Sequence, residues 1–509
     1  MQFVEFMNAF SAVLEPTTLV AILSGVLIGQ LVGILPGISS PAAIALLLPA
    51  TYALGPVPGL AMLCGIWLGS SYGGIITSVL LNIPGEGDSV IATLDGHQLA
   101  KQGRSALALG VSALGGFAAA SIALFLLQVL GPSIAGNALR FGPPQIFALM
   151  MFGLAIVAWL GGKSILKNMV SVATGLLIGT VGTDIVSGEA RLTFGSPELL
   201  QGIDFVAVVV GLFGLGEVLH TIGSKFRMGE RARFSFRDLL PRPGEWRPSI
   251  LSTLRGTTIG FLTGIVPGVG PTNATFIAYA VEKKVARDPD RFGKGAIEGV
   301  AAPGAAAHSA TIAGLIPLLA LGIPASATAA ILVGGFVIHG LFPGPLLYSQ
   351  RPDVVWGLIA SLYVANALLL LINTLFIPVL VLGVRLAHSH LSAVIGVLTM
   401  IGAYSLNNSV FDMWMALAFG ILGYLFRVLN IPIAPLVIAL VLGSKAEKSL
   451  RQSLVMSDGH LDIFFSSPIA VTLFLLAALV LVGPVTGRLL RRLRHSPDPG
   501  LAGSQDSSR

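Results

Sequence analysis

Charge is what this chain of 509 residues has least of. Asp, Glu, Lys and Arg make up only 11% of it, against roughly 25% in ordinary soluble domains. Hydrophobic residues make up 54%, and the mean hydropathy is +0.86. So few charges cannot solvate the surface of a soluble protein of this size. The composition therefore excludes a soluble multi-domain protein and indicates a membrane protein.

Several long stretches contain no charged residue. The charge-free runs cover residues 16–85, 105–139, 141–162, 256–281 and 299–350. A membrane-spanning helix needs about 20 apolar residues, and several apolar segments are shorter than that or are interrupted by Pro and Gly. We therefore expect an all-α polytopic membrane protein with about 12 transmembrane segments, some of them broken or re-entrant.

Cysteine and the common catalytic motifs are equally scarce. A single residue, Cys64, excludes a disulfide framework, a CxxC redox pair and a cysteine zinc site. Neither GxxxxGK[ST] nor HExxH occurs, so P-loop ATP hydrolysis and zincin chemistry lack their usual motifs. Residues 69–73 fit GxSxG with Ser71 as nucleophile, but that motif needs a strand-to-helix turn. An intramembrane serine hydrolase stays a remote alternative, and we expect no enzyme activity and no cofactor.

The charges that do occur divide the chain. We expect a first half at 1–223, a basic cytoplasmic linker at 224–254, a second half at 255–487, and a basic, disordered cytoplasmic tail at 488–509. Lys and Arg concentrate in cytoplasmic loops, whereas residues 1–17 contain neither, which favours a periplasmic N-terminus. The net charge of +6 follows these membrane-flanking segments without aromatic interleaving, so it does not indicate nucleic-acid binding.

An internal repeat is the strongest signal in the sequence. Residues 25–37 (GVLIGQLVGILPG) match residues 256–268 (GTTIGFLTGIVPG), and each copy has one glycine per helical turn before a Pro-Gly pair. Residues 82–85 (NIPG) likewise match residues 322–325 (GIPA). The first copy follows the expected periplasmic end and the second follows the basic linker, so we predict antiparallel, inverted-topology repeats. Such repeats are typical of secondary transporters, although broken helices also line channels.

The breaks are the predicted binding site. Carbonyls freed at a helix break can bind a hard cation such as Na⁺, and the helix N-termini beyond it favour an anion. The expected substrate or ion ligands are Pro36, Gly37, Ser39, Ser40, Asn82, Pro84, Gly85, Pro267, Gly268, Gly270, Thr272, Asn273, His308, Ser309, Pro324 and Ser326. Further candidates are Glu86, Asp88, Thr93, Asp95 and Glu298, of which the first two could equally belong to a solvated loop with an N-cap.

Several motifs, in fixed order, resemble the large membrane subunit, TctA, of the tripartite tricarboxylate transporter family. They are GILPGISSP from Gly33, LGSSYGGIITSVLLNIPGEGDSVIATLDGHQLAKQGRSALALG from Leu68, GTTIGFLTGIVPGVGPTNATFIAY from Gly256, FGKGAIEGVAAPGAAAHSAT from Phe292 and LALGIPASATAAILVGGFVIHGLFPGPLLY from Leu319. The resemblance extends to about Gly487.

The resemblance implies an inner-membrane permease that imports citrate-like tricarboxylates or related carboxylates, driven by Na⁺ or H⁺. It also implies a small TctB-like membrane subunit and a periplasmic, TctC-like solute-binding protein. The chain departs from the family pattern at Gly304, where Glu is usual, and at Ala307 and His308, where an Asn pair is usual. Ala325 also replaces a glycine. These departures predict a divergent substrate.

Overall fold

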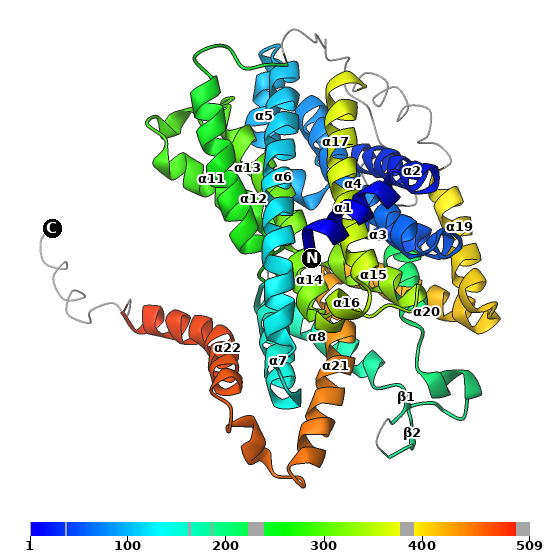
Figure 1. Cartoon of the computed structure of the whole chain (residues 1–509). Coiled ribbons are helices and arrows are strands. Elements are labelled where there is room, and N and C mark those ends of the chain that lie inside the picture. The colour runs from blue at the N-terminus through cyan, green and yellow to red at the C-terminus, as the bar shows by residue number, and fades with distance from the viewer. Residues whose placement is uncertain are drawn as a thin grey trace, which may run out of the picture.

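A computed structural model describes residues 2–35, 38–160, 164–184, 187–221, 239–376 and 391–494. Within these ranges the chain is almost entirely helical (Figure 1). The one sheet among the described residues is a short antiparallel hairpin of β1 (Gly182–Thr183) and β2 (Ala190–Arg191). The all-α expectation is therefore confirmed. Pro36 and Gly37 of the first predicted break, residues 224–238 of the basic linker and residues 495–509 of the tail lie outside the described residues.

The described helices follow one another along the chain in this order. The first part contains α1 (Gln2–Val13), α2 (Pro16–Ile34), α3 (Ser40–Leu47), η1 (Pro49–Leu54), α4 (Pro56–Leu81), η2 (Gly87–Ser89), α5 (Ala92–Lys101), α6 (Ser105–Ala138), α7 (Pro143–Leu160), α8 (Ile165–Gly179), η3 (Pro197–Gln201), α9 (Phe205–Val209), η4 (Val210–Leu215) and α10 (Gly216–Thr221). The second contains α11 (Trp246–Gly264), α12 (Gly270–Val285), η6 (Pro289–Arg291), α13 (Glu298–Ala313), α14 (Leu315–Leu321), α15 (Ala327–Ile338), α16 (Pro345–Gln350), α17 (Pro352–Leu375), α19 (Leu391–Asn407), α20 (Val410–Val428), α21 (Ala434–Met456), η7 (Leu461–Phe464) and α22 (Pro468–Arg494).

Six stretches of the described chain are long and apolar enough to cross a membrane. They are Pro16–Ile34, Pro56–Leu81, Ser105–Ala138, Glu298–Leu321, Pro352–Leu375 and Val410–Val428. Five shorter apolar helices accompany them. Because water is absent from the bilayer core, backbone groups there must be paired internally, which helices do. The protein is therefore a multi-pass helical membrane protein.

In each copy of the repeat, three glycines spaced four residues apart form a glycine stripe along one face of a helix, and the two stripes make the same kind of contact. A Cβ atom on Gly25, Gly29 or Gly33 of α2 would lie under 3.0 Å from a backbone carbonyl oxygen of α4. A Cβ atom on Gly256, Gly260 or Gly264 of α11 would meet the carbonyls of α13 in the same way. In each copy the stripe thus lets two backbones approach more closely than any side chain would allow.

The second repeated element also recurs in detail. Asn82 ends α4 and Gly322 ends α14, with φ of 58° and 69° respectively, in the left-handed region. The next residue, Ile83 or Ile323, donates its N–H to a carbonyl six residues back, at 3.4 Å and 3.0 Å. Both elements are therefore Schellman-type helix ends, which leave a break before the following helix.

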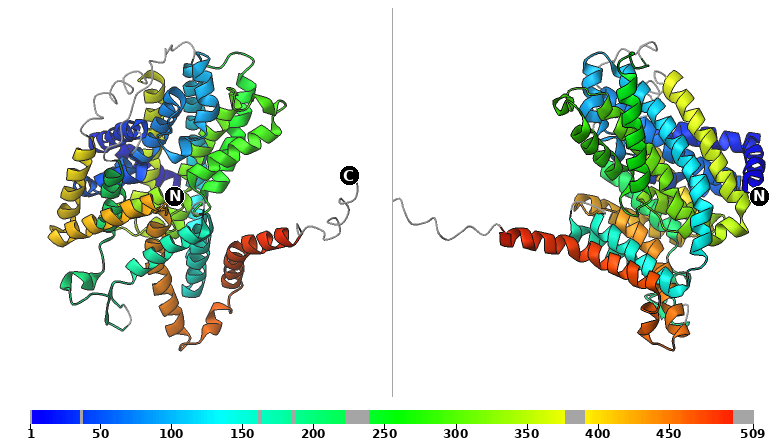
Figure 2. Two further views of the ribbon diagram at one scale, coloured as in Figure 1. Left: turned by 180° about the vertical axis from the view of Figure 1, so that it is seen from behind. Right: turned by 60° about the vertical axis from the view of Figure 1, so that its left-hand side comes forward.

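Helix α6 lies between the two groups that carry the stripes. It packs against α13 and α11 and also contacts α4. In Figure 1 the α11–α13 group lies on one side of α6, while α2, α3 and α4 lie on the other. Figure 2 shows α22 extending from the body beyond its contact with α7. The helix breaks lie inside the body, where the connections α2–α3, α11–α12 and α14–α15 meet.

Candidate functional site

The helix breaks surround a cavity of about 420 Å³. It is lined by Ser39, Ser40, Pro41, Trp67, Glu86, Gly87, Asp88, Val157, Gly268, Val269, Gly270, Pro271, Thr272, Asn273, Ala325, Ser326, Ala327, Thr328, Ala434, Pro435 and Ile438. The first residues of four helices, α3, α12, α15 and α21, are therefore all in its wall. Each helix N-terminus carries roughly half a positive charge, so their convergence favours an anion.

Proline explains why three of these helices begin where they do. Pro41, Pro271 and Pro435 each stand in the first turn of their helix. Proline suits that position because its fixed φ matches the helix and its missing N–H has no partner there anyway. Ser326 begins the fourth helix, and its hydroxyl accepts the Ala329 N–H at 3.2 Å.

One of the four N-termini already holds a carboxylate. Glu86 Oε1 accepts the backbone N–H of Ser40 at 2.6 Å and the Ser40 hydroxyl at 2.5 Å. The same hydroxyl lies 2.6 Å from Ser70 Oγ of α4. The side chain of Glu86 therefore occupies the anion-binding end of α3, so a substrate anion at this point would have to compete with it.

A second carboxylate stands beside the first. Asp88 Oδ2 accepts the Ser71 hydroxyl at 2.6 Å, whereas Asp88 Oδ1 is buried and has no hydrogen-bond partner among the described residues. Burying a carboxylate oxygen without a partner is costly. Asp88 therefore retains an unused acceptor at the cavity.

The second break has a different character. Gly268 and Gly270 have φ of 82° and 64°, and the Gly268 N–H donates to the Ala325 carbonyl at 3.0 Å. No side chain among the described residues caps the first turn of α12. The Asn273 amide instead donates back to the Val269 carbonyl at 2.6 Å. The N-terminus of α12 is thus the part of the cavity wall best suited to receive an external anion.

The two acids have perturbed protonation equilibria. Both lie between α4 and α5, outside the six candidate spans. Burial, together with the charge of Asp88, raises the pKa of Glu86 to about 8, although the hydrogen bonds from Ser40 oppose the shift. Burial also raises the pKa of Asp88, against the hydrogen bond from Ser71. The cavity therefore favours a state in which at least one of the two carboxyls is protonated or paired with a cation.

The structure brings together nine of the expected residues in this cavity. Seven are from the expected ligands, Ser39, Ser40, Gly268, Gly270, Thr272, Asn273 and Ser326, and two are from the further candidates, Glu86 and Asp88. Four others shape the breaks without lining the cavity: Asn82, Pro84, Pro267 and Pro324. Gly85 is a packing residue, because a Cβ there would lie under 3.0 Å from the Gly33 carbonyl oxygen.

Two expected ligands lie away from the cavity, in the middle of α13. Ser309 donates its hydroxyl to the Thr257 carbonyl of α11 at 2.8 Å. His308 is fully buried and stacks on Tyr72 of α4, with ring centroids 3.8 Å apart. His308 therefore takes part in the packing of α13 against α4 and is not among the residues that line the cavity.

Asp95 connects the two halves of the chain. Its Oδ1 accepts the backbone N–H groups of Gly293, Gly295 and Ala296 at 2.8–2.9 Å, and its Oδ2 accepts the Tyr279 hydroxyl at 2.8 Å. The buried carboxylate thus fixes the loop that leads into α13. Thr93, nearby on α5, donates its hydroxyl to the Val90 carbonyl at 2.7 Å.

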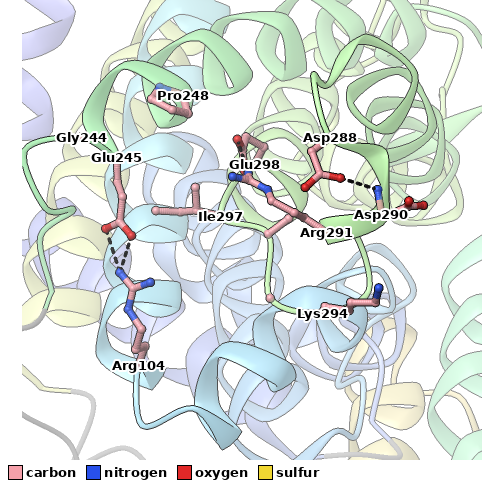
Figure 3. A pocket seen from close by; sticks show the side chains of 12 residues that line it. Arg104, Gly244, Glu245, Pro248, Asp288, Asp290, Arg291, Lys294, Ile297 and Glu298 are labelled. Carbon is pink, nitrogen blue, oxygen red and sulfur yellow. Dashed lines mark hydrogen bonds and ion pairs between the residues drawn. The ribbon is translucent and has the colours of Figure 1, made fainter.

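Glu298 lines a separate charged crevice of about 410 Å³ (Figure 3). There Arg291 Nη2 lies 2.6 Å from the Glu298 carboxylate, and Arg104 Nη2 lies 2.6 Å from that of Glu245. Figure 3 shows both arginines turned toward their glutamates. Because these arginines and glutamates form ion pairs with each other, we interpret the crevice as a structural contact between segments of both halves.

Sequence reasoning missed two contributions to this region. The N-terminus of α21 lines the cavity, and Lys445 on the same helix donates to the Gly322 carbonyl at 2.9 Å, at the end of α14. A lysine at a helix C-terminus is electrostatically favourable. Only the tertiary fold joins α21 to the breaks, so no motif in the sequence could have revealed either feature. Among the described residues, no group of three or more His, Cys, Asp and Glu is placed to hold a metal ion.

A bundle of broken apolar helices, with their N-termini around one cavity that contains two carboxylates, is the architecture of a solute transporter. Residues 19–438 match the model of the tripartite tricarboxylate transporter TctA family. The chain belongs to this family and is a membrane subunit of a tricarboxylate transporter. The identification suggested by the motifs is thus confirmed.

Two relatives from Agrobacterium vitis are similar to the chain. One, described as an uncharacterized 52.8 kDa protein in the TAR-I ttuC' 3' region, is 40% identical over 464 residues, covering 91% of this chain and 92% of the relative. The other, described as an uncharacterized protein in the TAR-II ttuC' 3' region, is 40% identical over 214 residues, covering 42% of this chain and 88% of the relative. No solved structure matches.

Proposed function

We propose that the chain imports a carboxylate, citrate-like or related, together with a cation, through the cavity at the helix breaks. The observation that carries the proposal is the convergence of four helix N-termini on a cavity that also contains Glu86 and Asp88. The N-termini favour an anion, and the backbone N–H groups supply donors that match carboxylate oxygens.

The two acids are the reason for including a cation. A carboxylate substrate next to an ionised Glu86 and Asp88 would be repelled in a cavity of low dielectric constant. Protonation of one acid, or Na⁺ bound at the Asp88 carboxylate, removes that repulsion. Substrate and cation then bind best together, which is the thermodynamic requirement for symport. Na⁺ and H⁺ are the two candidate coupling ions.

The remaining parts of the proposal concern assembly and topology. A small TctB-like membrane subunit and a periplasmic TctC-like binding protein would complete the transporter in the bacterial inner membrane. The two halves, with equivalent stripes and helix ends, would be inverted in the membrane, with the N-terminus periplasmic and the C-terminus cytoplasmic. The support is the asymmetry of Lys and Arg along the chain.

The alternatives receive less support. A channel would also place broken helices around a polar cavity. A serine hydrolase would need Ser71 at an exposed strand-to-helix turn. Ser71 instead lies within α4, buried, and its hydroxyl is bonded to Asp88.

Uptake into proteoliposomes that contain all three subunits tests the proposal. Labelled citrate and related dicarboxylates are supplied with the Na⁺ gradient and the proton gradient imposed separately. Saturable uptake that one gradient drives above equilibrium supports the proposal. If the labelled substrate only equilibrates and neither gradient changes its uptake, the result would support a channel. If the wild type releases a hydrolysis product and Ser71→Ala does not, the result would support the hydrolase.

A further inference from the structure

Three buried polar side chains meet where α4, α6 and α13 pack together. They are Tyr72, Ser112 and His308, which are 3%, 2% and 0% exposed. The Tyr72 hydroxyl, the Ser112 hydroxyl and both ring nitrogens of His308 have no hydrogen-bond partner among the described residues. The stacked arrangement of Tyr72 and His308 keeps their polar atoms in separate, nearly parallel planes, with an angle of 21° between them.

Two glycines make room for this cluster. The position that a Cβ on Gly116 of α6 would take lies 2.8 Å from His308 Nε2 and 2.9 Å from Tyr72 Oη. A Cβ on Gly304 of α13 would lie 2.9 Å from Ser112 Oγ. Gly116 of α6 therefore faces Tyr72 of α4 and His308 of α13, and Gly304 of α13 faces Ser112 of α6. The glycines leave the space that these polar side chains occupy. Gly304 and His308 are also two of the positions that depart from the family pattern.

A small cavity adjoins Tyr72 and Ser112. Its volume is about 10 Å³, and Tyr72, Ser112 and Asn373 are the polar residues in its wall. That volume is about the minimum that admits one water molecule, and a buried water needs two to four polar partners. A buried hydroxyl without a partner costs about 1–3 kcal/mol, so several such groups in one place need a common partner.

We propose that the cluster is a binding site for a buried water molecule that bridges Tyr72 Oη and Ser112 Oγ beside His308. The water joins α4 of the first half to α6, and through the stack of Tyr72 on His308 it joins both helices to α13 of the second half. The site is separate from the substrate cavity and does not depend on the identity of the substrate. The cavity wall offers only the two hydroxyls and the Asn373 amide as oxygen ligands, fewer than the roughly six that a hard cation takes, which favours water over Na⁺.

A structure of the full-length chain in lipid nanodiscs, at a resolution that shows ordered water, tests the site directly. We expect density within hydrogen-bond distance of Tyr72 Oη and Ser112 Oγ that is retained when Na⁺ is replaced by choline. Density with five or more short oxygen contacts that disappears in choline would overturn the assignment in favour of a cation. The absence of any density would overturn it as well.

Thermal melts of hydroxyl-deletion variants provide a second readout. If a water bridges the two hydroxyls, Tyr72→Phe and Ser112→Ala each lower the melting temperature, and the double variant loses less than the sum of the two shifts. If the cluster is dry, each variant leaves the melting temperature unchanged or raises it, which contradicts the proposal. Ser361→Ala is the control, because that buried hydroxyl bonds the Leu358 carbonyl of its own helix and should add independently to Tyr72→Phe.

Discussion

Glu86 Oε1 accepts both the backbone N–H and the hydroxyl of Ser40, at 2.6 Å and 2.5 Å, and thereby caps α3. Glu86, which directly follows the second repeated element, thus closes the anion-binding end of a helix that begins shortly after the first. This contact makes Glu86 an internal competitor for a substrate carboxylate. Its protonation, which weakens the attraction to the helix N-terminus, would open that end to substrate.

The raised pKa of Glu86 should affect how the free energy of unfolding depends on pH. Burial raises its pKa from the ordinary value of 4.5 to about 8. The folded protein therefore keeps a proton that the unfolded chain releases between these values, so the free energy of unfolding falls as the pH rises from about 4.5 to about 8. We expect Glu86→Gln to flatten this part of the curve in melts of the purified protein. Glu15→Gln, at an exposed position before α2, is the matched control and should leave it unchanged. An identical slope in wild type and Glu86→Gln would contradict the assignment.

Removal of the cap should also change substrate binding. Because an ionised Glu86 competes for the N-terminus of α3, we expect carboxylate affinity to decline as the pH rises toward 8 in the wild type. In Glu86→Gln the affinity should vary little with pH. Direct binding of labelled citrate to the purified protein measures this. Equal pH dependence in both proteins would mean that Glu86 does not face the substrate.

The glycine stripes predict a sharp contrast among Gly→Ala variants. Gly29→Ala in α2 and Gly260→Ala in α11 each place a methyl group against a backbone carbonyl that cannot move aside. We expect each to lower the free energy of unfolding by about 1–3 kcal/mol or more. Gly136→Ala is the control, because a Cβ there would meet no atom within 4 Å apart from the backbone of its own helix, α6. It should be neutral or stabilising by up to about 1 kcal/mol. Equal effects at all three positions would refute the stripe as a packing surface.

Asp95 is predicted to be structural. Asp95→Ala leaves three loop N–H groups and the Tyr279 hydroxyl without their acceptor, so we expect a loss of about 3 kcal/mol in stability. Tyr279→Phe removes one of these bonds and should cost about 1 kcal/mol. Melting curves measure whether Asp95→Ala loses more stability than Tyr279→Phe. A stable Asp95→Ala protein with altered substrate selectivity would instead place Asp95 in the transport site.

The sequence predicted the breaks better than it predicted their partners. Gly268, Gly270 and Ser326 could be placed at the site because Pro-Gly pairs and repeats are local signals. His308 and Asp95 carry equally prominent chemistry, yet one stacks in a helix interface and the other anchors a loop. Their neighbours come from distant parts of the chain, so spacing alone could not distinguish a ligand from a packing residue. The contribution of α21 depended on tertiary contacts in the same way.

The central claim is that a carboxylate and a cation bind in the same cavity. Equilibrium binding of labelled citrate, with related dicarboxylates in parallel, tests it most directly. It is measured with Na⁺ or choline and across pH 5–9, on the wild type and on the Glu86→Gln/Asp88→Asn double variant. We expect cation- or proton-dependent affinity in the wild type and weak dependence in the double variant. A wild-type affinity that changes with neither Na⁺ nor pH would contradict a shared cavity. A double variant whose affinity depends on the ions as much as that of the wild type would contradict it as well.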